Sequence, residues 1–226
     1  MFFLILTSVL VLLYLFIPWQ TTMLVMGIDR TPEGTSAGRT DTLILVGYNP
    51  FTPSFKMLSI PRDIWLNIPG VGENRINTAH FFAELNSPGS GPQAAVEAVR
   101  ANFLIDPQYF VRIQFEGFQD VVDAMGGVDI QLTKTMAGYL PGSYHLTGNE
   151  ALVFVRNRTG TDDFFRMENG QFLLQSVFRQ MIQPAKWQHF PQILLALARM
   201  TDTNLPVWHW PRLMSALLRV GPQGIE

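Results

Sequence analysis

The chain has 226 residues, which is enough for one domain of about 200 residues with an N-terminal appendage. Its composition, 47% hydrophobic and 15% charged, is typical of a folded protein and excludes a disordered one. The net charge of −2 argues against a general nucleic-acid binder, and the absence of cysteine excludes thiol catalysis and thiolate metal sites.

A long apolar run opens the chain, from Phe2 to Ile17, with two hydroxyl residues as its only interruption. As a helix it spans roughly 25 Å, slightly less than a hydrocarbon core of about 30 Å. Pro18 ends the run, and Trp19 follows at the position of an interfacial anchor. We therefore predict a retained transmembrane anchor over residues 1–19 and a domain over residues 20–226. A segment buried in the domain core is the alternative.

Three apolar runs of strand length follow the anchor: Met23 to Ile28, Thr42 to Tyr48 and Phe55 to Ile60. Branched and aromatic residues are frequent in all three, and Asn49-Pro50 marks a turn between the second and the third. We predict that these runs are core strands of one sheet.

Helical and strand patterns alternate over the rest of the chain, which predicts a layered α/β domain. Glycine pairs and prolines mark the ends of the helices. In chain order the predicted elements are a helix from Pro92 to Leu104, a strand from Tyr109 to Gln114, a helix from Phe115 to Met125, a strand from Val128 to Leu132, a helix ending near Pro184, and helices before Pro206 and after Pro211.

Two aspartates stand at the ends of the first two predicted strands. Asp29 comes directly after the first strand, and Asp41 comes directly before the second. If these strands are adjacent and antiparallel, those two ends meet. Two carboxylates in contact repel each other unless a cation or a shared proton lies between them, and oxygen ligands of this kind suit Mg²⁺. The alternative is that both aspartates cap turns.

Arginines stand close to the same predicted sheet edge. Arg39 precedes Asp41 by two residues, and the pair Arg62-Asp63 follows the third strand. The guanidinium fork binds phosphate or carboxylate at two points, so this placement is compatible with a phosphate site. A plain surface salt bridge is the alternative interpretation of the Arg62-Asp63 pair.

A second arginine group consists of Arg156, Arg158 and Arg166, with Asp163 one helical turn before the last of them. We expect residues 154–158 to be extended, so that Arg156 and Arg158 point the same way. Three arginines within eleven residues of a slightly acidic protein indicate an anion site. A solvated charged face is the alternative.

Taken together, these segments resemble the LytR–CpsA–Psr family. The matching stretches follow the family's order and cover nearly the whole chain after Gln20. They are LVMGIDR (24–30), GRTDTLILV (38–46), MLSIPRDIWLNIPG (57–70), RINTAH (75–80), VRIQFEGFQDVVDAMGGVDI (111–130), and LTGNEALVFVRNR (146–158) with DFFR (163–166).

The resemblance implies a three-layer α/β sandwich, with a mixed central sheet flanked by helices and one N-terminal transmembrane helix. It also implies an apolar pocket for a polyprenyl chain and a magnesium ion held by Asp29 and Asp41. Asp63 and Asp163 are implied to orient the arginines. The implied phosphate-binding arginines are Arg39, Arg62, Arg156, Arg158 and Arg166.

One stretch departs from the family pattern. The family often continues past its last arginine with a further arginine and a pair of glutamines. Here those places hold Asn169, Gly170 and Gln171, so part of the phosphate grip differs.

The implied function is that of a phosphotransferase. It transfers a glycopolymer, such as teichoic acid or capsule, from a polyprenyl-pyrophosphate carrier to peptidoglycan, at the outer side of the cell membrane. Phosphoryl transfer requires mainly positioning and charge neutralisation, which arginines and Mg²⁺ supply. The expected catalytic group is Asp29, Asp41, Arg62 and Asp63, with Asp63 as the candidate base.

Two other functions are compatible with the same motifs. A magnesium-dependent hydrolase that splits the same pyrophosphate with water differs only in the access of the acceptor. A non-catalytic regulator of the cell envelope is the third reading, but the chain has neither a helix-turn-helix signal nor a basic face. We expect contacts with membrane lipid and none with nucleic acid.

Overall fold

The computed structural model describes residues 20–28, 37–49, 51, 54–157, 163–181 and 183–220, together with Leu6 and Tyr14. Within these ranges it leaves out the side chains of residues 115, 116, 163–166, 187, 190, 194 and 200. In the part of the chain so described, no helix has the length and the apolar character that a membrane crossing requires. The predicted anchor at residues 1–19 lies outside the described residues, apart from Leu6 and Tyr14.

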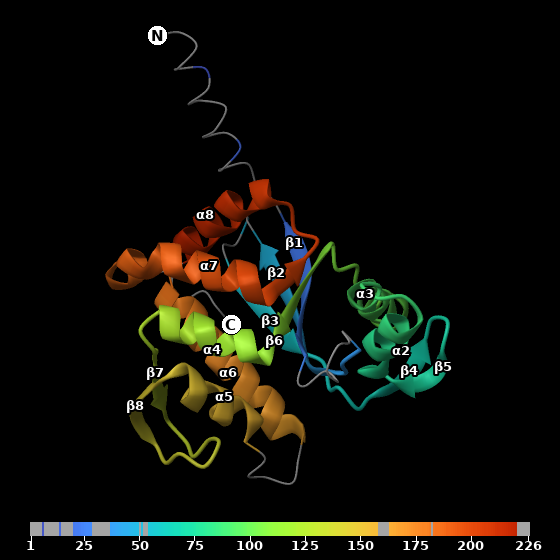
Figure 1. Cartoon of the computed structure of the whole chain (residues 1–226), viewed down its shortest axis with the longest axis horizontal. Coiled ribbons are helices and arrows are strands. Elements are labelled where there is room, and N and C mark those ends of the chain that lie inside the picture. The colour runs from blue at the N-terminus through green and yellow to red at the C-terminus, as the bar shows by residue number, and fades with distance from the viewer. Residues whose placement is uncertain are drawn as a thin grey trace.

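A five-stranded mixed sheet forms the centre of the protein, in the order β3-β2-β1-β6-β9 (Figure 1). β1 pairs antiparallel with β2 and parallel with β6, while the two outer strands pair antiparallel with their neighbours. The predicted core strands and the mixed sheet are therefore confirmed. The strands are β1 Thr21–Ile28, β2 Thr40–Asn49, β3 Ser54–Ser59, β6 Tyr109–Gln114 and β9 Thr201–Thr203.

Helices flank the sheet on both faces, so that it is the middle one of three layers (Figure 1). α2 (Thr78–Asn86) and α3 (Gly91–Phe103) cover one face, beside a hairpin of β4 (Trp65–Ile68) and β5 (Gly72–Arg75). The remaining elements belong to the opposite side: α4 Phe115–Ala124, β7 Val128–Leu132, β8 Gly142–Leu146, α5 Gly148–Arg156, α6 Asp163–Met181, η1 Pro184–His189, α7 Phe190–Met200, η2 Val207–His209 and α8 Trp210–Val220.

The side chains of β1 divide between the two faces of the sheet. Leu24 and Met26 are fully buried in the cluster that includes α2 and α3. Met23 and Val25 belong to a different cluster, which includes residues of α6 and α8. A strand covered on both faces needs apolar residues at every position, and this explains the uninterrupted apolar run in the sequence.

The predicted extended conformation around Arg156 is wrong, because this residue ends the helix α5. Thr147 begins that helix with a capping box: its Oγ1 accepts a hydrogen bond from the backbone N–H of Glu150, and the Glu150 carboxylate accepts one from the backbone N–H of Thr147. Ala151 and Phe154 are buried at helical spacing and hold the helix on the core. The helix C-terminus, and not a strand, therefore presents Arg156.

Candidate functional site

The ends of β1 and β2 lie side by side, as predicted for a site at this edge of the sheet. Ile28 pairs with Thr40, whereas the preceding residue, Gly27, pairs with Thr42. Asp41 is therefore the extra residue of a β-bulge, a feature that terminates regular pairing and redirects side chains. Asp29, which follows Ile28 in the sequence, lies outside the described residues.

Arg62 contacts the carboxylate of Asp41. Its Nη1 lies 2.5 Å from Asp41 Oδ1, and its Nε lies 3.4 Å from Asp63 Oδ2. Arg75 donates to the other oxygen of Asp63 at 3.0 Å. The side chains of Arg62 and Asp41 are only 23% and 19% exposed. These four groups form a continuous chain of alternating charges, so Arg62 is held from two sides and is no isolated surface salt bridge.

Arg39 lies at the surface of the same region. Its guanidinium carbon is 5.6 Å from the centre of the Phe81 ring, within the range of a cation–π contact. The neighbouring carbonyl, that of Gly38, contacts Nδ1 of the fully buried His80 at 2.8 Å. The backbone beside Arg39 is therefore fixed to α2.

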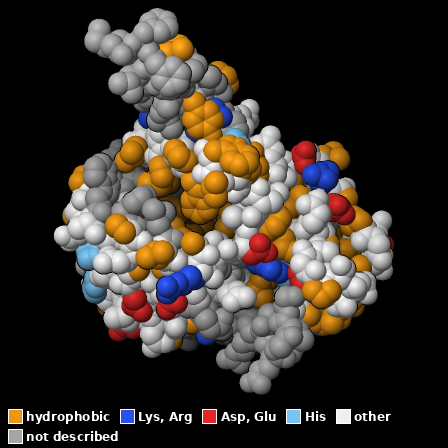
Figure 2. Space-filling model, turned by 45° about the horizontal axis from the view of Figure 1, so that its top comes forward, with side chains coloured by type: hydrophobic (Ala, Val, Ile, Leu, Met, Phe, Trp, Pro, Cys, Tyr) orange, Lys and Arg blue, Asp and Glu red, His pale blue; other side chains and the backbone are white. Residues whose placement is uncertain are grey.

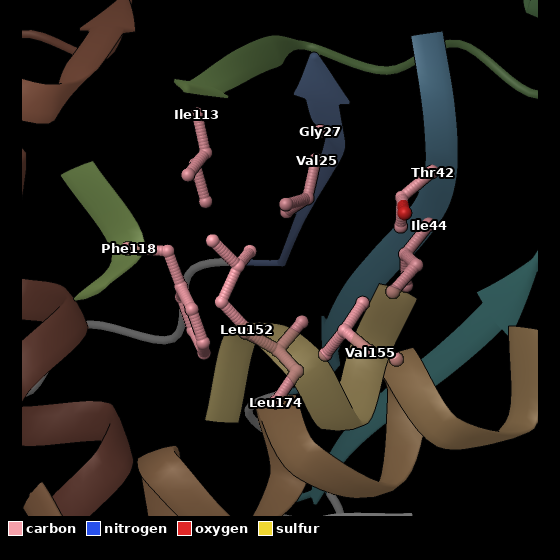
Figure 3. Close-up of a pocket in the computed structure, with 10 residues that line it drawn as sticks. Val25, Gly27, Thr42, Ile44, Ile113, Phe118, Leu152, Val155 and Leu174 are labelled. Carbon is pink, nitrogen blue, oxygen red and sulfur yellow. The ribbon is translucent and has the colours of Figure 1, made fainter. Parts of the chain in front are cut away.

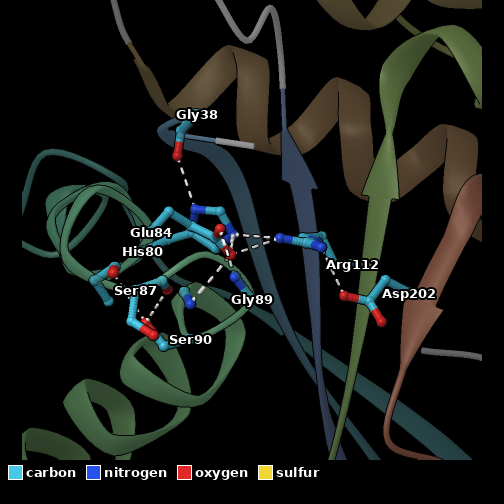
Figure 4. Close-up of polar contacts among 10 residues, drawn as sticks. Gly38, His80, Glu84, Ser87, Gly89, Ser90, Arg112 and Asp202 are labelled. Carbon is cyan, nitrogen blue, oxygen red and sulfur yellow. Dashed lines mark hydrogen bonds and ion pairs between the residues drawn. The ribbon is translucent and has the colours of Figure 1, made fainter. Parts of the chain in front are cut away.

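The ring of His80 is held in one tautomer by its two neighbours. Nδ1 donates to the Gly38 carbonyl, and we therefore assign Nε2 as the acceptor that faces Nη1 of Arg112 at 3.3 Å (Figure 4). Burial lowers the pKa of His80, and the nearby Arg112 charge acts in the same direction. Both causes favour the neutral ring that this tautomer requires.

Arg112 joins this buried cluster to the far edge of the sheet. Its Nη1 donates to Glu84 at 2.8 Å, and its Nη2 lies 2.7 Å from Asp202 of β9 (Figure 4). Glu84 also accepts hydrogen bonds from the backbone N–H groups of Gly89 and Gly91. Sequence analysis singled out none of these residues. Their polar side chains gave no sign that they would be buried together.

An apolar pocket lies between the sheet and helices α4, α5 and α6 (Figure 3). Thr42, adjacent to Asp41, lines it on one side, and Val155, adjacent to Arg156, lines it on another. The chain neighbours of two predicted site residues therefore belong to the wall of the pocket. The other lining residues are Val25, Gly27, Ile44, Ile113, Phe118, Leu152, Gly170 and Leu174.

A second, deeper cavity of about 160 Å³ lies between the sheet and helices α6, α7 and α8. It shares Val25, Ile113, Phe118 and Leu174 with the first pocket, so the two cavities adjoin, and we refer to them together as the hollow. Apart from Thr201, its lining is apolar. The α6 residues Leu174, Val177, Phe178 and Met181 line this cavity.

The stretch that departs from the family pattern lies on α6, beside the pocket. A Cβ atom added to Gly170 would meet only Val155 Cγ1, at 4.0 Å, so its position has room for a side chain. Gln171 accepts a hydrogen bond from Ser59 of β3 at 3.0 Å. Gly170 thus leaves space in the pocket wall, while Gln171 fixes α6 to the sheet.

The structure brings Asp41, Arg62 and Asp63 together, and it places Arg156, partly buried, at the end of α5. Arg158 lies outside the described residues, and α6 contains Asp163 and Arg166 with backbone positions only. Within the described ranges, no group of three or more histidines and acidic residues is arranged to hold a metal ion. The predicted magnesium site therefore depends on Asp41 together with Asp29.

Comparison with known proteins gives one consistent result. A family model described as the LytR_cpsA_psr family matches residues 19–226. The polyisoprenyl-teichoic acid–peptidoglycan teichoic acid transferase TagU of Bacillus mycoides is 31% identical over 191 residues, which are 81% of this chain and 60% of the relative. TagU of Oceanobacillus iheyensis is 33% identical over 81% of this chain and 58% of its own length. The chain therefore spans about 60% of the curated relatives that it matches.

Solved structures show the same fold. The crystal structure of B. subtilis TagV has a TM-score of 0.75 and 27% identity, and the match covers 92% of this chain and 82% of that one. A structure of TagT bound to LI-WTA has a TM-score of 0.72 and 25% identity, with 88% of this chain and 74% of that one covered.

Proposed function

The chain belongs to the LytR–CpsA–Psr family, and we propose that it is a phosphotransferase that moves a glycopolymer from a polyprenyl-pyrophosphate carrier to peptidoglycan. One observation carries this proposal: an apolar pocket is lined by Thr42 and Val155, the chain neighbours of Asp41 and Arg156, and Asp41 contacts Arg62. A substrate with a long apolar tail and a doubly charged head matches that combination. The names of the curated relatives, which are teichoic acid transferases acting on peptidoglycan, support the same substrates.

The arginines are proposed to bind the pyrophosphate. A pyrophosphate diester carries two negative charges, which suit bidentate guanidinium partners. Arg62 is oriented by Asp41 and Asp63 before any substrate arrives, so little orientational freedom is lost on binding. We propose that Arg39, Arg156, Arg158 and Arg166 complete this phosphate site.

We propose a magnesium ion beside the bulge. Asp41 supplies a largely buried carboxylate, and Asp29 is adjacent in sequence to Ile28, whose partner on β2 adjoins Asp41. Hard carboxylate oxygens are the ligands that Mg²⁺ prefers. We propose that Asp29 and Asp41 hold the ion, which when bound neutralises charge on the pyrophosphate.

In the proposed reaction, a sugar hydroxyl of peptidoglycan attacks the phosphorus on the glycan side. A new oxygen–phosphorus bond forms, and the bond from that phosphorus to the bridging oxygen breaks. Polyprenyl phosphate leaves with the electron pair, and its chain stays in the hollow. Asp63 is more exposed than Asp41, at 40% against 19%, and we propose it as the acceptor of the hydroxyl proton.

The proposed location follows from the same substrates. Peptidoglycan lies outside the cell membrane, so the domain at residues 20–226 is proposed to be extracytoplasmic. The apolar run within residues 1–19 is proposed to anchor it by a single membrane pass.

The test compares Arg62→Ala with Arg100→Ala. Arg100 lies on α3, is 47% exposed and pairs only with Asp106 among the ion pairs of the described residues. Loss of a positioned phosphate partner costs about 2–4 kcal/mol of transition-state stabilisation, or roughly 30- to 1000-fold in rate. Loss of an exposed arginine costs almost nothing.

The assay measures glycan attached to peptidoglycan and polyprenyl phosphate released, with the melting temperature of each variant as the control for folding. Equal transfer rates for Arg62→Ala and Arg100→Ala would contradict the proposal that Arg62 binds the pyrophosphate. If the unaltered protein releases polyprenyl phosphate but attaches no glycan to peptidoglycan, the function is that of a hydrolase and not of a transferase.

A further inference from the structure

Two large apolar side chains stand out into solvent at the short helix η2. Val207 is 75% exposed and Trp208 is 63% exposed, and they are consecutive in the chain. Pro206 precedes them and Pro211 follows shortly after, so the backbone here has little freedom. We call residues 207–208 the η2 tip. Contiguous exposed apolar patches mark sites of contact with proteins or membranes.

The η2 tip lies next to Tyr14. The hydroxyl of Tyr14 donates a hydrogen bond to the backbone carbonyl of Trp208, and the guanidinium of Arg212 lies 4.8 Å from the centre of the Tyr14 ring. Tyr14 belongs to the run from Phe2 to Ile17. Tyrosine, tryptophan and arginine at the border of an apolar segment are the residues typical of the interface between lipid and water.

The charge of this part of the chain fits an anionic surface. Residues 183–220 contain four basic residues and a single acidic one, although the whole chain has a net charge of −2. The acidic residue, Asp202, is bound to Arg112 at 2.7 Å. Basic residues near a bilayer are attracted by anionic headgroups over about one Debye length.

The hollow lies directly behind this surface. Leu213, Met214 and Leu217 of α8 line the deeper cavity, and Trp210, two residues after Trp208, lines it as well. Figure 2 shows hydrophobic side chains gathered around a hollow on the face formed by the upper helices of Figure 1. A membrane at the η2 tip would therefore adjoin the wall of the hollow.

We propose that the η2 tip, with the guanidinium of Arg212 close to it, docks on the surface of an anionic phospholipid bilayer. This contact is made by η2 in addition to the proposed anchor at residues 1–19, and it does not require any reaction at the charged edge. It fixes the orientation of the domain, so that α8 and the hollow face the lipid.

The test uses the full chain in vesicles that contain anionic lipids with brominated acyl chains, which quench nearby tryptophan fluorescence. Trp208→Phe is compared with Trp65→Phe, because Trp65 is 64% exposed on the opposite layer of the protein and provides a matched control. Trp208→Phe should lower the quenched fraction of the emission, and Trp65→Phe should raise it. An equal change in both variants would overturn the docking.

A second arm separates docking from catalysis. Val207→Asp should reduce turnover of a polyprenyl-pyrophosphate substrate embedded in anionic vesicles about fivefold, because one charge near an anionic surface changes the binding free energy by about 1 kcal/mol and an added negative charge is repelled. Turnover of the same substrate dispersed in detergent should stay unchanged. Unchanged turnover in vesicles would contradict the docking, whereas absence of turnover in both media from the unaltered protein would contradict only the proposed function.

Discussion

The two faces of the central sheet differ although the same strands build both. Leu24 and Met26 of β1 pack against α2 and α3 with no exposed surface, whereas Met23 and Val25 face a hollow. One face is therefore solid and the other is open. The alternation along a strand here separates residues that stabilise the fold from residues that can receive a ligand. An uninterrupted apolar run in a sequence does not by itself distinguish the two.

The largest expected difference between the two faces is in the loss of stability when one leucine on each face is truncated. Leu24→Ala should lower the free energy of unfolding by about 2–5 kcal/mol, because it leaves a cavity in a packed core. Leu174→Ala should cost about 1 kcal/mol, because Leu174 already lines the hollow and truncation there only enlarges it. Chemical denaturation of both variants measures the difference, and equal losses would show that the hollow is packed in solution.

Filling the hollow should separate activity from stability. Val25→Trp places an aromatic ring where the two cavities meet, and we expect about a 100-fold loss of transfer through misplaced substrate. Its melting temperature should change little. Leu24→Trp, one residue away on the solid face, should instead lower stability by about 1–3 kcal/mol through overpacking. The comparison fails if Val25→Trp unfolds the protein or leaves transfer unchanged.

A smaller effect is expected at Gly170, in the wall of the hollow. Gly170→Ala should raise the free energy of unfolding by about 0.5–1 kcal/mol, because glycine weakens a helix interior and the added Cβ has space. Transfer should stay close to that of the unaltered protein. Gly170→Leu should keep the stability gain and slow transfer. A loss of stability in the alanine variant would mean that the site is tighter than the structure indicates.

The smallest expected effect is the pH dependence of the unfolding free energy, and it arises from His80 on the solid side of the sheet. Burial lowers the pKa of His80, so the unfolded chain binds a proton more readily than the folded protein. The stability from neutral His80 is therefore present above its ordinary pKa of about 6.5 and is lost as pH falls from there through the lowered folded pKa. His80→Asn should flatten the unfolding free energy over that window. Denaturant titrations at several pH values measure it, and an unchanged slope would exclude this role.

The sequence predicted the core strands because their apolar runs are long and bounded by turn residues. It left antiparallel pairing of the first two strands as the condition for their ends to meet, and the pairing of β1 with β2 satisfies that condition. It missed α5, because alternating residues near Arg156 imitate a strand while the capping box lies further back, at Thr147. It also missed α2, where His80 and Glu84 are buried polar residues that hide the apolar face.

Other features depend on tertiary structure alone. β9 has three residues, too few for a periodic pattern, and it becomes a strand only because β6 offers a partner. The hollow is the space between helices and sheet, and no single segment encodes it. The contact between Arg62 and Asp41 joins the segment after β3 to the start of β2. Residue types suggested that contact, but only the folded chain specifies its geometry.

The bulge at Asp41 also determines where the apolar lining of the hollow ends. Thr42 lines the hollow, so regular alternation would turn Thr40 to the same side. The extra residue changes the phase: Thr40 pairs with Ile28 and donates its backbone N–H to the carbonyl of Asn77, next to α2. The apolar lining at Thr42 is therefore directly adjoined by a charged residue, Asp41. Deletion of that one residue would turn the polar side chains toward the apolar lining of the hollow. The boundary between the apolar lining and the charged residues would then be lost.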